Sequence, residues 1–380
     1  MTAPDILASC ARAALFGWVV LAAANGGFWR ARETDAEPVP EPAHWPAVTA
    51  VVPARDEAAV IAQSLNSLLA QDYPGAFRVV LVDDHSSDGT GAIARGLGCG
   101  RLSVIDGAPL ASGWTGKLWA VRQGVEAAGA PDYLWLTDAD IAHAPDTLRS
   151  LVARSEAERL VLNSAMVRLA TESFAEKAIV PAFVWFFAML YPFAQVNDPD
   201  HTKAAAAGGS MLARRDAFEA AGGIASIRSA LIDDCALGAV MKRQGRIRLQ
   251  LTDRSRSLRA YGWRELFQMT ARSAYAQLKF NPLLLLGTVA ALALLFFAPP
   301  LAVATLQGGP RLAGAAAAGL MAGLYQPMLT RYGRSPLWGF ALPLIGAFYL
   351  AATLWSAVEH LRGRGGMWKG RAQAVAGAGV

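Results

Sequence analysis

The sequence predicts a membrane-anchored α/β protein, in which a domain with a mostly parallel sheet is flanked by N-terminal and C-terminal transmembrane helices. Three observations predict this class. Of the 380 residues, 54% are hydrophobic and 17% are charged, whereas about 25% of a typical soluble domain is charged. The hydrophobic residues gather near the two ends of the chain. Between them, short β-branched runs alternate with stretches of helical period, which is typical of a parallel sheet covered by helices.

Residues 6–25 form the first apolar segment, and Arg30 and Arg32 follow it closely. A cleaved signal peptide carries its basic residues before the apolar run, so this order predicts an uncleaved anchor. The positive-inside rule then places the basic flank in the cytosol. We therefore assign residues 1–28 to an N-terminal transmembrane anchor and residues 29–46, which are rich in proline and acids, to a linker.

Residues 47–260 carry the α/β pattern, with strands expected at residues 48–53, 78–82 and 133–137. One uncharged, aromatic-rich stretch inside this domain, residues 178–196, has three interpretations. It is a buried core segment, a helix on the membrane surface or a true span. We favour the helix at the membrane interface.

Three further apolar segments lie within residues 282–360, after an amphipathic stretch, residues 261–281, that we expect at the membrane surface. The first segment, residues 282–306, is uncharged and longer than the roughly 20 residues that span a bilayer. Basic residues between positions 254 and 279 precede it, so the positive-inside rule places the middle of the chain in the cytosol. Three crossings would leave the basic tail, residues 361–380, outside, against the same rule. Either one of the last two segments is re-entrant or interfacial, or the tail is an exception.

Composition excludes other classes of protein. The formal net charge of +5 comes without any basic run interleaved with aromatic residues, so nucleic acid is not an expected partner. The three cysteines, Cys10, Cys99 and Cys235, contain no C-x-x-C pair, which argues against a zinc site and against a disulfide framework. Both features favour a reducing compartment for most of the chain.

Acidic side chains follow each of the three expected strands. Asp56 and Glu57 come after the first, Asp84 after the second, and Asp138 and Asp140 after the third. Ligands bind at the carboxyl edge of such sheets, so this series predicts a ligand site there. These acids also have structural interpretations. In these, Asp56 is a helix cap, the residues after Asp84 form a turn, and the D-x-D sequence is a solvated loop.

The series resembles the family 2 glycosyltransferases, which have the GT-A fold, a Rossmann-like and mostly parallel nucleotide-diphospho-sugar transferase fold, and which use nucleotide sugars with inversion. The resemblance covers roughly residues 48–275 and includes the V-V-P-A-R-D-E, D-D-x-S, G-K and D-x-D motifs. It implies that the following residues bind the nucleotide sugar: Pro53, Arg55, Glu57, Asp84, Lys117, Asp138, Gly209, Ser210 and Arg272. Asp84 would accept a hydrogen bond from uracil, which favours a UDP-sugar.

The same resemblance implies a divalent cation and a catalytic base. Asp138 would lie near the ribose or the metal, and Asp140 would be a direct ligand of Mg²⁺ or Mn²⁺, which prefer carboxylate oxygens. Asp234 would be the base that deprotonates the acceptor, and Asp233 stands beside it where glutamate is commoner. The structural alternatives are an acidic pair at a helix N-terminus for these two residues and a solvated surface lysine for Lys117.

One motif departs from the family pattern. Processive members carry Q-x-x-R-W, whereas here Gln268 is out of register with Arg272 and the tryptophan is absent. This departure favours a single transfer to a lipid over polymer synthesis. The D-D-C-A-L and A-R-S-A-Y sequences and the tail at residues 365–371 are most similar to the hopanoid-associated glycosyltransferases, although the W-K-G-R part also resembles carotenoid-type enzymes.

The expected protein is therefore a multi-pass enzyme of the inner, cytoplasmic membrane with a cytosolic catalytic domain. It would transfer a sugar from a nucleotide sugar to a hopanoid-like or other isoprenoid or sphingoid lipid of the bilayer. The alternatives are a ceramide-type or carotenoid-type acceptor, a polyprenyl phosphate acceptor, and a non-catalytic GT-A scaffold in a lipid-synthesis complex.

Overall fold

The chain divides into two compact units, which are described separately. The computed structural model describes residues 2–363, 367–368 and 371–372. The helical unit comprises Met1–Arg32, Thr171–Ala194 and Ala260–Gly365, and the sheet unit comprises mainly Glu33–Ala170 and Gln195–Arg259. Residues 171–194, which we expected inside the α/β domain, therefore pack with the helices. Part of the W-K-G-R tail lies outside the described residues.

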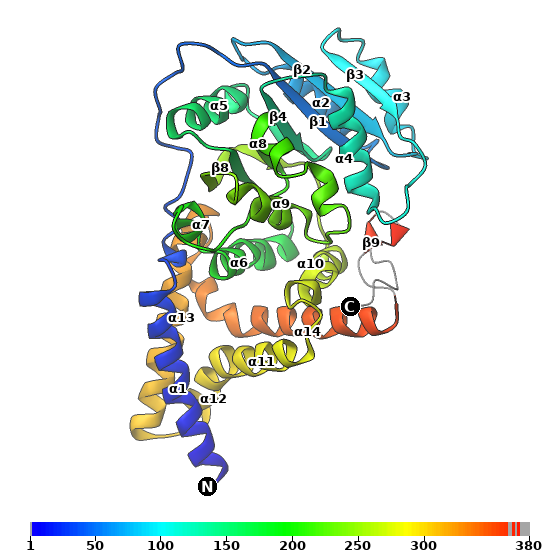
Figure 1. Cartoon of the computed structure of the whole chain (residues 1–380). Coiled ribbons are helices and arrows are strands. Elements are labelled where there is room, and N and C mark those ends of the chain that lie inside the picture. The colour runs from blue at the N-terminus through cyan, green and yellow to red at the C-terminus, as the bar shows by residue number, and fades with distance from the viewer. Residues whose placement is uncertain (1, 364–366, 369–370, 373–380) are drawn as a thin grey trace. The chain divides into compact units, whose positions relative to one another are not determined.

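The sheet unit is built on one eight-stranded sheet with the order β3-β2-β1-β4-β7-β6-β8-β5 (Figure 1). Its strands are β1 Val48–Ala54, β2 Phe77–Asp83, β3 Leu102–Asp106, β4 Tyr133–Thr137, β5 Ile141–His143, β6 Leu162–Arg168, β7 Ser210–Arg214 and β8 Ile247–Ser257. The helices of this unit are α2 Ile61–Leu69, α3 Thr90–Gly96, α4 Gly116–Ala127, α5 Thr147–Glu158, α8 Arg215–Ala220 and α9 Asp233–Lys242, with the 3₁₀-helix η2 Ile224–Ile227.

The three strands expected from the sequence, β1, β2 and β4, are consecutive members of the parallel ladder β3-β2-β1-β4. All residues of β1 are buried, as a continuous apolar strand between two covered faces should be. Ala54 at the end of β1 pairs with Asp83 at the end of β2, so their carboxyl ends meet at one edge. Strand β7 runs antiparallel to β4, and the pairing of Thr137 with Ser210 brings the start of β7 to that same edge.

Glycine allows α4 to approach the sheet closely. A Cβ atom at Gly124 would lie 2.4 Å from Cγ1 of Val51 on β1 and 3.1 Å from Cγ2 of Val82 on β2. No real side chain tolerates the shorter of these distances, so α4 can adopt this position only with glycine here. The position of α4 matters because its first turn carries Lys117.

The predicted linker is fixed against the sheet unit from Glu33 onward. Leu251 N on β8 donates to the Glu33 carbonyl at 2.8 Å. The Asp35 carboxylate accepts a hydrogen bond from the Thr252 hydroxyl and lies 3.2 Å from the Arg254 guanidinium. This segment is therefore part of the domain in the structure.

The helical unit holds the remaining long helices. These are α1 Ala3–Ala24, α6 Phe174–Leu190, α7 Phe193–Asn197 at its border, α10 Trp263–Gln277, α11 Pro282–Leu292, α12 Ala298–Thr305, α13 Gly308–Arg331 and α14 Leu342–Leu361. Short 3₁₀-helices, η1 Phe28–Arg30 and η4 Pro336–Ala341, and a π-helical turn, η3 Ala293–Phe297, connect them.

Helix α6 is buried within this unit, so the interpretation as a helix lying on the membrane surface is corrected. Trp185 at its centre is fully buried, and its indole donates to the Leu324 carbonyl of α13 at 3.1 Å. Trp18 of α1 stacks on the same indole with ring centroids 6.0 Å apart. The aromatic richness of this stretch therefore serves helix packing.

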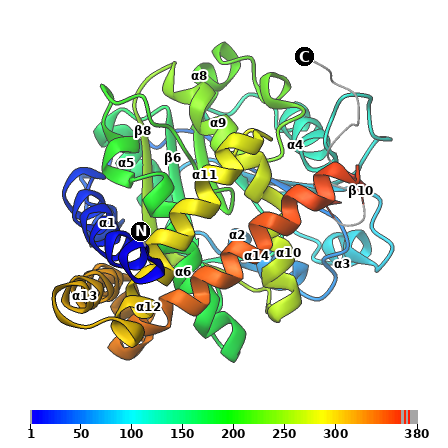
Figure 2. The same ribbon diagram turned by 90° about the horizontal axis from the view of Figure 1, so that it is seen from below.

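Within the described part of the chain, four helices are long and apolar enough to cross a membrane: Ala3–Ala24, Pro282–Thr305, Gly308–Arg331 and Pro336–Leu361. They do not all run in one direction. Both views of the helical unit show α11 and α14 running across the direction of α1 and α13 (Figures 1 and 2). The chain changes direction between α11 and α12 at the π-helical turn Ala293–Phe297, a type of helix irregularity that is a known cause of kinks.

We expect the substitution Gly124→Ala to lower the free energy of unfolding of the detergent-solubilised protein by about 1–3 kcal/mol, because the new methyl group overpacks the contact of α4 with Val51. Thermal or denaturant unfolding measures this. Gly96→Ala on α3 is the control, since a Cβ there meets nothing within 4 Å. Equal stability of the two variants would contradict the close approach of α4.

Candidate active site

The loops after β1 and β2 are joined by hydrogen bonds into one rim of the carboxyl edge. Asp56 Oδ1 accepts a hydrogen bond from Ser87 N at 2.8 Å, and Glu57 N donates to Thr90 Oγ1 at 2.8 Å. Helix α2 begins only at Ile61, so the interpretation of Asp56 as a helix cap is wrong. Asp56 adopts a φ of 50°, in the left-handed region that is costly for a non-glycine residue and is found most often at functional sites.

Arg55 connects this rim to the end of β2. Its Nη1 donates to the Asp84 carbonyl at 2.5 Å and lies 3.7 Å from the Asp84 carboxylate. Asp84 is fully buried. The guanidinium therefore fixes the main chain at the position where the resemblance expects the base of the nucleotide to bind.

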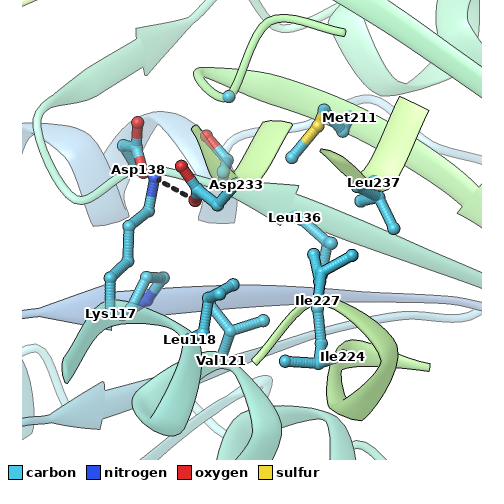
Figure 3. A pocket seen from close by; sticks show the side chains of 13 residues that line it. Lys117, Leu118, Val121, Leu136, Asp138, Met211, Ile224, Ile227, Asp233 and Leu237 are labelled. Carbon is cyan, nitrogen blue, oxygen red and sulfur yellow. Dashed lines mark ion pairs between the residues drawn. The ribbon is translucent and has the colours of Figure 1, made fainter. Parts of the chain in front are cut away.

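Lys117 is the electrostatic centre of the site. It lies in the first turn of α4, after Thr115 caps that helix through Leu118 N. Its ammonium is 2.9 Å from Asp138 Oδ1 and 3.0 Å from Asp233 Oδ2 (Figure 3). The side chain is only 19% exposed. The alternative of a solvated surface lysine is therefore wrong.

The two acids of the fourth motif lie in the first turn of α9. Asp234 Oδ2 accepts a hydrogen bond from Gly208 N at 3.0 Å, and Oδ1 accepts one from Cys235 N at 2.7 Å. The structural interpretation as an acidic pair at a helix N-terminus thus holds as well. Asp233 extends to Lys117, so the fourth motif is joined to the D-x-D motif through one lysine.

The glycine-rich segment before β7 needs small residues. A Cβ atom at Gly208 would lie 3.5 Å from Asp234 Oδ2 and 3.6 Å from the Lys117 ammonium, so this glycine lies between the two groups. A Cβ at Gly209 would lie 2.8 Å from both γ-carbons of Val167. Close backbone approach is therefore the reason for glycine at position 209, whereas a Cβ at Gly208 would make only ordinary contacts.

Arg259, at the end of β8, is a site residue that sequence reasoning missed. Its Nη2 lies 2.6 Å and 2.8 Å from the two oxygens of Glu57, and its Nε lies 3.1 Å from Asp140 Oδ2. It thereby joins the first motif to the D-x-D motif. In the sequence it stood only among the basic residues that indicate topology, and no local pattern marks it as a site residue.

Burial and charge together set the ionisation of the acids. Burial raises the pKa of Asp138 and of Asp140, and the neighbouring cations Lys117 and Arg259 oppose this rise. Burial raises the pKa of Asp234 to about 6; the Asp233 carboxylate adds to the rise and Lys117 opposes it. Burial lowers the pKa of Lys117, but the two carboxylates outweigh it and raise that pKa above its usual range, so the ammonium stays charged.

The residues present fit a divalent cation that shares its ligands with a diphosphate. Asp138 and Asp140 follow β4, and in these ion pairs each gives one carboxylate oxygen to a cationic side chain. Among the described residues, no group of three or more His, Cys, Asp or Glu side chains could hold a metal alone. One or two carboxylates with substrate phosphates are a usual environment for Mg²⁺. A zinc site does not fit this donor set.

A pocket opens beside this charge cluster (Figure 3). Lys117, Asp138 and Asp233 lie at one end of it, and Pro53, Thr137 and Gly208 also line it. The rest of the lining is apolar and comes from Leu118, Val121, Leu136, Met211, Ile224, Ile227 and Leu237. Of the residues that the resemblance assigned to the donor site, Ser210 instead accepts a hydrogen bond from the buried Trp135 indole at 3.0 Å. Arg272 lies on α10 in the helical unit, and its role stays a prediction.

His143 lies beneath the D-x-D loop and was also missed. Its Nε2 is 3.0 Å from Thr137 Oγ1 and its Nδ1 is 2.8 Å from Ser255 Oγ. Because Thr137 Oγ1 donates to the Gly209 carbonyl, it accepts from Nε2, and Nδ1 is left to accept from the serine. This assignment requires a neutral ring, and burial lowers the pKa of His143 to about 3.

We expect His143 to make stability fall in mild acid. The unfolded chain takes up a proton below a pKa of about 6.5 while the native ring stays neutral down to about 3, so the stabilisation is complete above 6.5 and is lost as the pH falls. Between pH 6.5 and 5 the loss is about 2 kcal/mol. Unfolding curves of the wild type and of His143→Gln across this range measure it. The variant should show the shallower dependence, and equal slopes would contradict the neutral buried ring.

At this edge of the sheet, acids that follow β1 and β4 and one acid of α9 are gathered around two cations, Lys117 and Arg259. Known proteins are similar to this chain in sequence and in fold. Residues 49–222 match the sequence profile of the family described as glycosyl transferase family 2. This segment is therefore similar to the family 2 glycosyltransferases, and the prediction of the GT-A fold is confirmed.

Two curated relatives are both named 4,4'-diaponeurosporenoate glycosyltransferase. The protein from Staphylococcus aureus strain MRSA252 is 28% identical over 201 residues, 52% of this chain and 52% of the relative. The protein from strain bovine RF122 / ET3-1 is 27% identical over 200 residues, with the same coverage of 52% and 52%. The chain spans about half the length of the curated relatives it matches.

A solved structure has a similar fold over most of the chain. It is described as the mannosyltransferase PcManGT from Pyrobaculum calidifontis in complex with GDP-Man and Mn²⁺. The likeness covers 94% of this chain and 99% of that chain, with 22% sequence identity and a TM-score of 0.56. At this identity the likeness shows the fold.

Proposed function

We propose that this protein transfers a sugar, with inversion, from a nucleotide sugar to a hydroxyl group of an isoprenoid membrane lipid. The observation that carries the proposal is the partly buried connection from Asp138 through Lys117 to Asp233, which stands directly beside Asp234. It joins the acids expected at the donor to the acid expected at the acceptor. A scaffold without activity would have no need to keep these charges together and shielded from water.

The donor binds along the carboxyl edge. Arg55 and Asp84 hold the nucleoside, and a UDP-sugar is proposed because the resemblance gives Asp84 to uracil. Lys117 supplies positive charge at the diphosphate as negative charge develops on the leaving group. Asp138 and Asp140 would hold Mg²⁺ or Mn²⁺, which supplies further neutralisation of that charge when bound.

Asp234 is the general base. As the lipid hydroxyl oxygen forms its bond to the anomeric carbon, the hydroxyl proton passes to the Asp234 carboxylate. The anomeric carbon–oxygen bond to the diphosphate breaks, and its electron pair leaves with the nucleoside diphosphate. The Gly208 amide holds the carboxylate in place at 3.0 Å. Because the pKa of Asp234 is raised to about 6, the carboxylate is ionised and ready above that pH and still basic enough to take the proton.

The acceptor is proposed to be hopanoid-like. The four apolar helices support an acceptor drawn from the bilayer. The two curated relatives are named for a carotenoid-type substrate, which supports an isoprenoid lipid. The D-D-C-A-L form of the fourth motif favours the hopanoid branch of that class. A polyprenyl phosphate is the second candidate, and it is already ionised and needs no base.

We expect purified protein in detergent to transfer labelled sugar from a UDP-sugar to a hydroxylated polycyclic isoprenoid lipid, and Asp234→Asn to lower the rate by a factor of about 10²–10⁴ because no base remains. EDTA should stop the transfer, and added Mn²⁺ or Mg²⁺ should restore it. Asp216→Asn is the control, since Asp216 is an exposed acid of the same unit that pairs with Arg214. Product analysis by thin-layer chromatography and mass spectrometry gives the readout.

Each contrary result has its own meaning. Full activity of Asp234→Asn with a polyprenyl phosphate would show that this phosphate, the second candidate, is the acceptor in place of a lipid alcohol. Donor binding without turnover of any lipid would indicate a scaffold. A strain that lacks the gene should lose one glycolipid, and an unchanged lipid profile would contradict a role in glycolipid synthesis.

We propose further that the catalytic domain and the basic tail lie on the same, cytosolic side of the inner membrane. Helix α1 crosses, α12 and α13 enter and return as a hairpin, and α11 and α14 lie along the membrane surface, as their direction across α1 and α13 suggests (Figure 2). Large side chains on both helices are exposed in the protein: Leu283 on α11 by 76% and Leu344 on α14 by 78%. In this arrangement one of the last two apolar segments is interfacial and does not cross the membrane. The basic tail then lies in the cytosol, as the positive-inside rule requires.

Reporter fusions test this topology. We expect green fluorescent protein fused after Arg362 to fluoresce, and alkaline phosphatase fused there to be inactive, because both reporters stay in the cytosol. Fusions after residue 46 provide the matched control for the side of the catalytic domain. Opposite results at the two positions would show that the chain crosses an odd number of times after the domain.

A further inference from the structure

The ammonium of Lys242 is held by an unusual number of main-chain carbonyls. Lys242 is the last residue of α9, the helix whose first turn carries Asp233 and Asp234. Its Nζ lies 2.8 Å from the carbonyls of Val196 and Asp198, 2.6 Å from that of Lys203 and 3.3 Å from that of Gln195. An ammonium has three protons to donate, so these four oxygens can satisfy all of its hydrogen bonds.

These carbonyls belong to the irregular segment 195–209, which leads to β7. Two of them are at the C-terminus of the short helix α7, where carbonyls lack partners within the helix and attract a positive charge. The segment then turns through residues 198–203 without regular structure. Without a cation, these carbonyl oxygens would repel one another, because each carries a partial negative charge. Lys242 therefore holds the start of the segment in one conformation.

The same segment contacts α9 along the whole length of the helix. A Cβ at Gly238 would lie 2.6 Å from the Ala205 carbonyl carbon, so helix and chain are in direct contact. One turn closer to the site, Cys235 Sγ donates to the Ala206 carbonyl at 3.7 Å. At the first turn, Asp234 accepts from Gly208 N at 3.0 Å. Segment 195–209 thus runs along α9 from Lys242 to Asp234, about 12 Å by the rise of a helix.

We propose that Lys242 is a positioning residue for the base. It fixes the far end of segment 195–209 and thereby holds the Gly208 amide on the Asp234 carboxylate, so that the base faces the acceptor in one orientation. The inference deepens the proposed function and rests on it for the role of Asp234. A displacement of about 1 Å at a reacting group can lower a rate about a hundredfold, so a remote clamp of this kind has a kinetic effect.

The variant Lys242→Met tests the proposal, since methionine keeps the length of the side chain and removes the ammonium. We expect kcat to fall at least tenfold while KM for the nucleotide sugar changes less than about twofold, because most of the donor residues follow β1, β2 and β4 or lie on α4, outside the clamped segment. Arg243→Met is the matched control at the next position, where the side chain is exposed. An unchanged kcat in Lys242→Met, or a KM for the donor that rises as much as kcat falls, would overturn the proposal.

Chemical rescue separates a positioning role from a loss of folding. In Lys242→Ala, propylammonium supplies the atoms from Cγ to Nζ that the substitution removes, and we expect it to restore kcat at least fivefold. Tetramethylammonium at the same concentration is the control, since it carries the charge but cannot donate a hydrogen bond. Equal responses to the two cations would contradict the carbonyl cage.

Hydrogen exchange gives a readout that does not depend on activity. We expect amides 204–209 to exchange at least tenfold faster in Lys242→Met than in Arg243→Met, with unchanged protection in β1 and β4. Equal protection of these amides would overturn the clamp. If the wild type transfers no sugar to any lipid, the proposed function fails, and this measurement still decides whether Lys242 holds the segment.

Discussion

The site depends on one positive charge placed between acids that would otherwise repel one another. Asp138, Asp233 and Asp234 come from two different elements and are gathered in a protected edge of the sheet. Without a cation between them, at least one would take up a proton at neutral pH, as closely placed carboxylates do. The Lys117 ammonium makes it possible for the donor acids and the base to be charged together. The close packing of α4 through Gly124, and the cap at Thr115, both serve to hold that ammonium in place.

Arg259 repeats this principle on the other side of the D-x-D loop. It neutralises Glu57 and Asp140 together, so each acid of the D-x-D motif has its own cation. The two cations also differ in what they can do. Arginine forms a planar and persistent pair with two acids, whereas a lysine ammonium is a compact charge that can turn toward a phosphate. The arrangement therefore joins one rigid and one adaptable partner, which suits a site proposed to receive a highly charged donor.

Much of the domain was predictable because its signals are local. The strands β1, β2 and β4 are continuous apolar runs, and the acids that follow them are adjacent in sequence, so both the strands and the acids of the edge could be read directly. Arg259 and Lys242 were not predictable, since their roles arise from pairing with residues between 39 and 202 positions away. Asp56 looked like a helix cap because only the fold brings Ser87 to it.

The apolar segments show a second limit of sequence reasoning. The hydropathy of a segment predicts whether apolar groups surround it, but not the direction in which the helix runs. Helix α6 is rich in apolar residues, yet most of its 17 residues are buried against other helices. Helix α14 is equally apolar, and only its course relative to α1 and α13 distinguishes lying along a surface from crossing a bilayer (Figure 2). A similar change of direction, between α11 and α12, occurs at the π-helical turn Ala293–Phe297, next to the prolines at the start of α12.

The fixed segment 33–46 has a consequence for how separable the catalytic domain is. It contributes hydrogen bonds to β8 and ion pairs to Arg254 and Arg149, so these arginines and that strand are complete only with it. A chain cut at Ala47, where the composition changes, would lose these partners. The sheet unit therefore starts at Glu33, although the composition changes only near Ala47. The sheet unit is also interrupted by residues 171–194 of the helical unit, so a fragment that begins at Glu33 would need a short connection in their place.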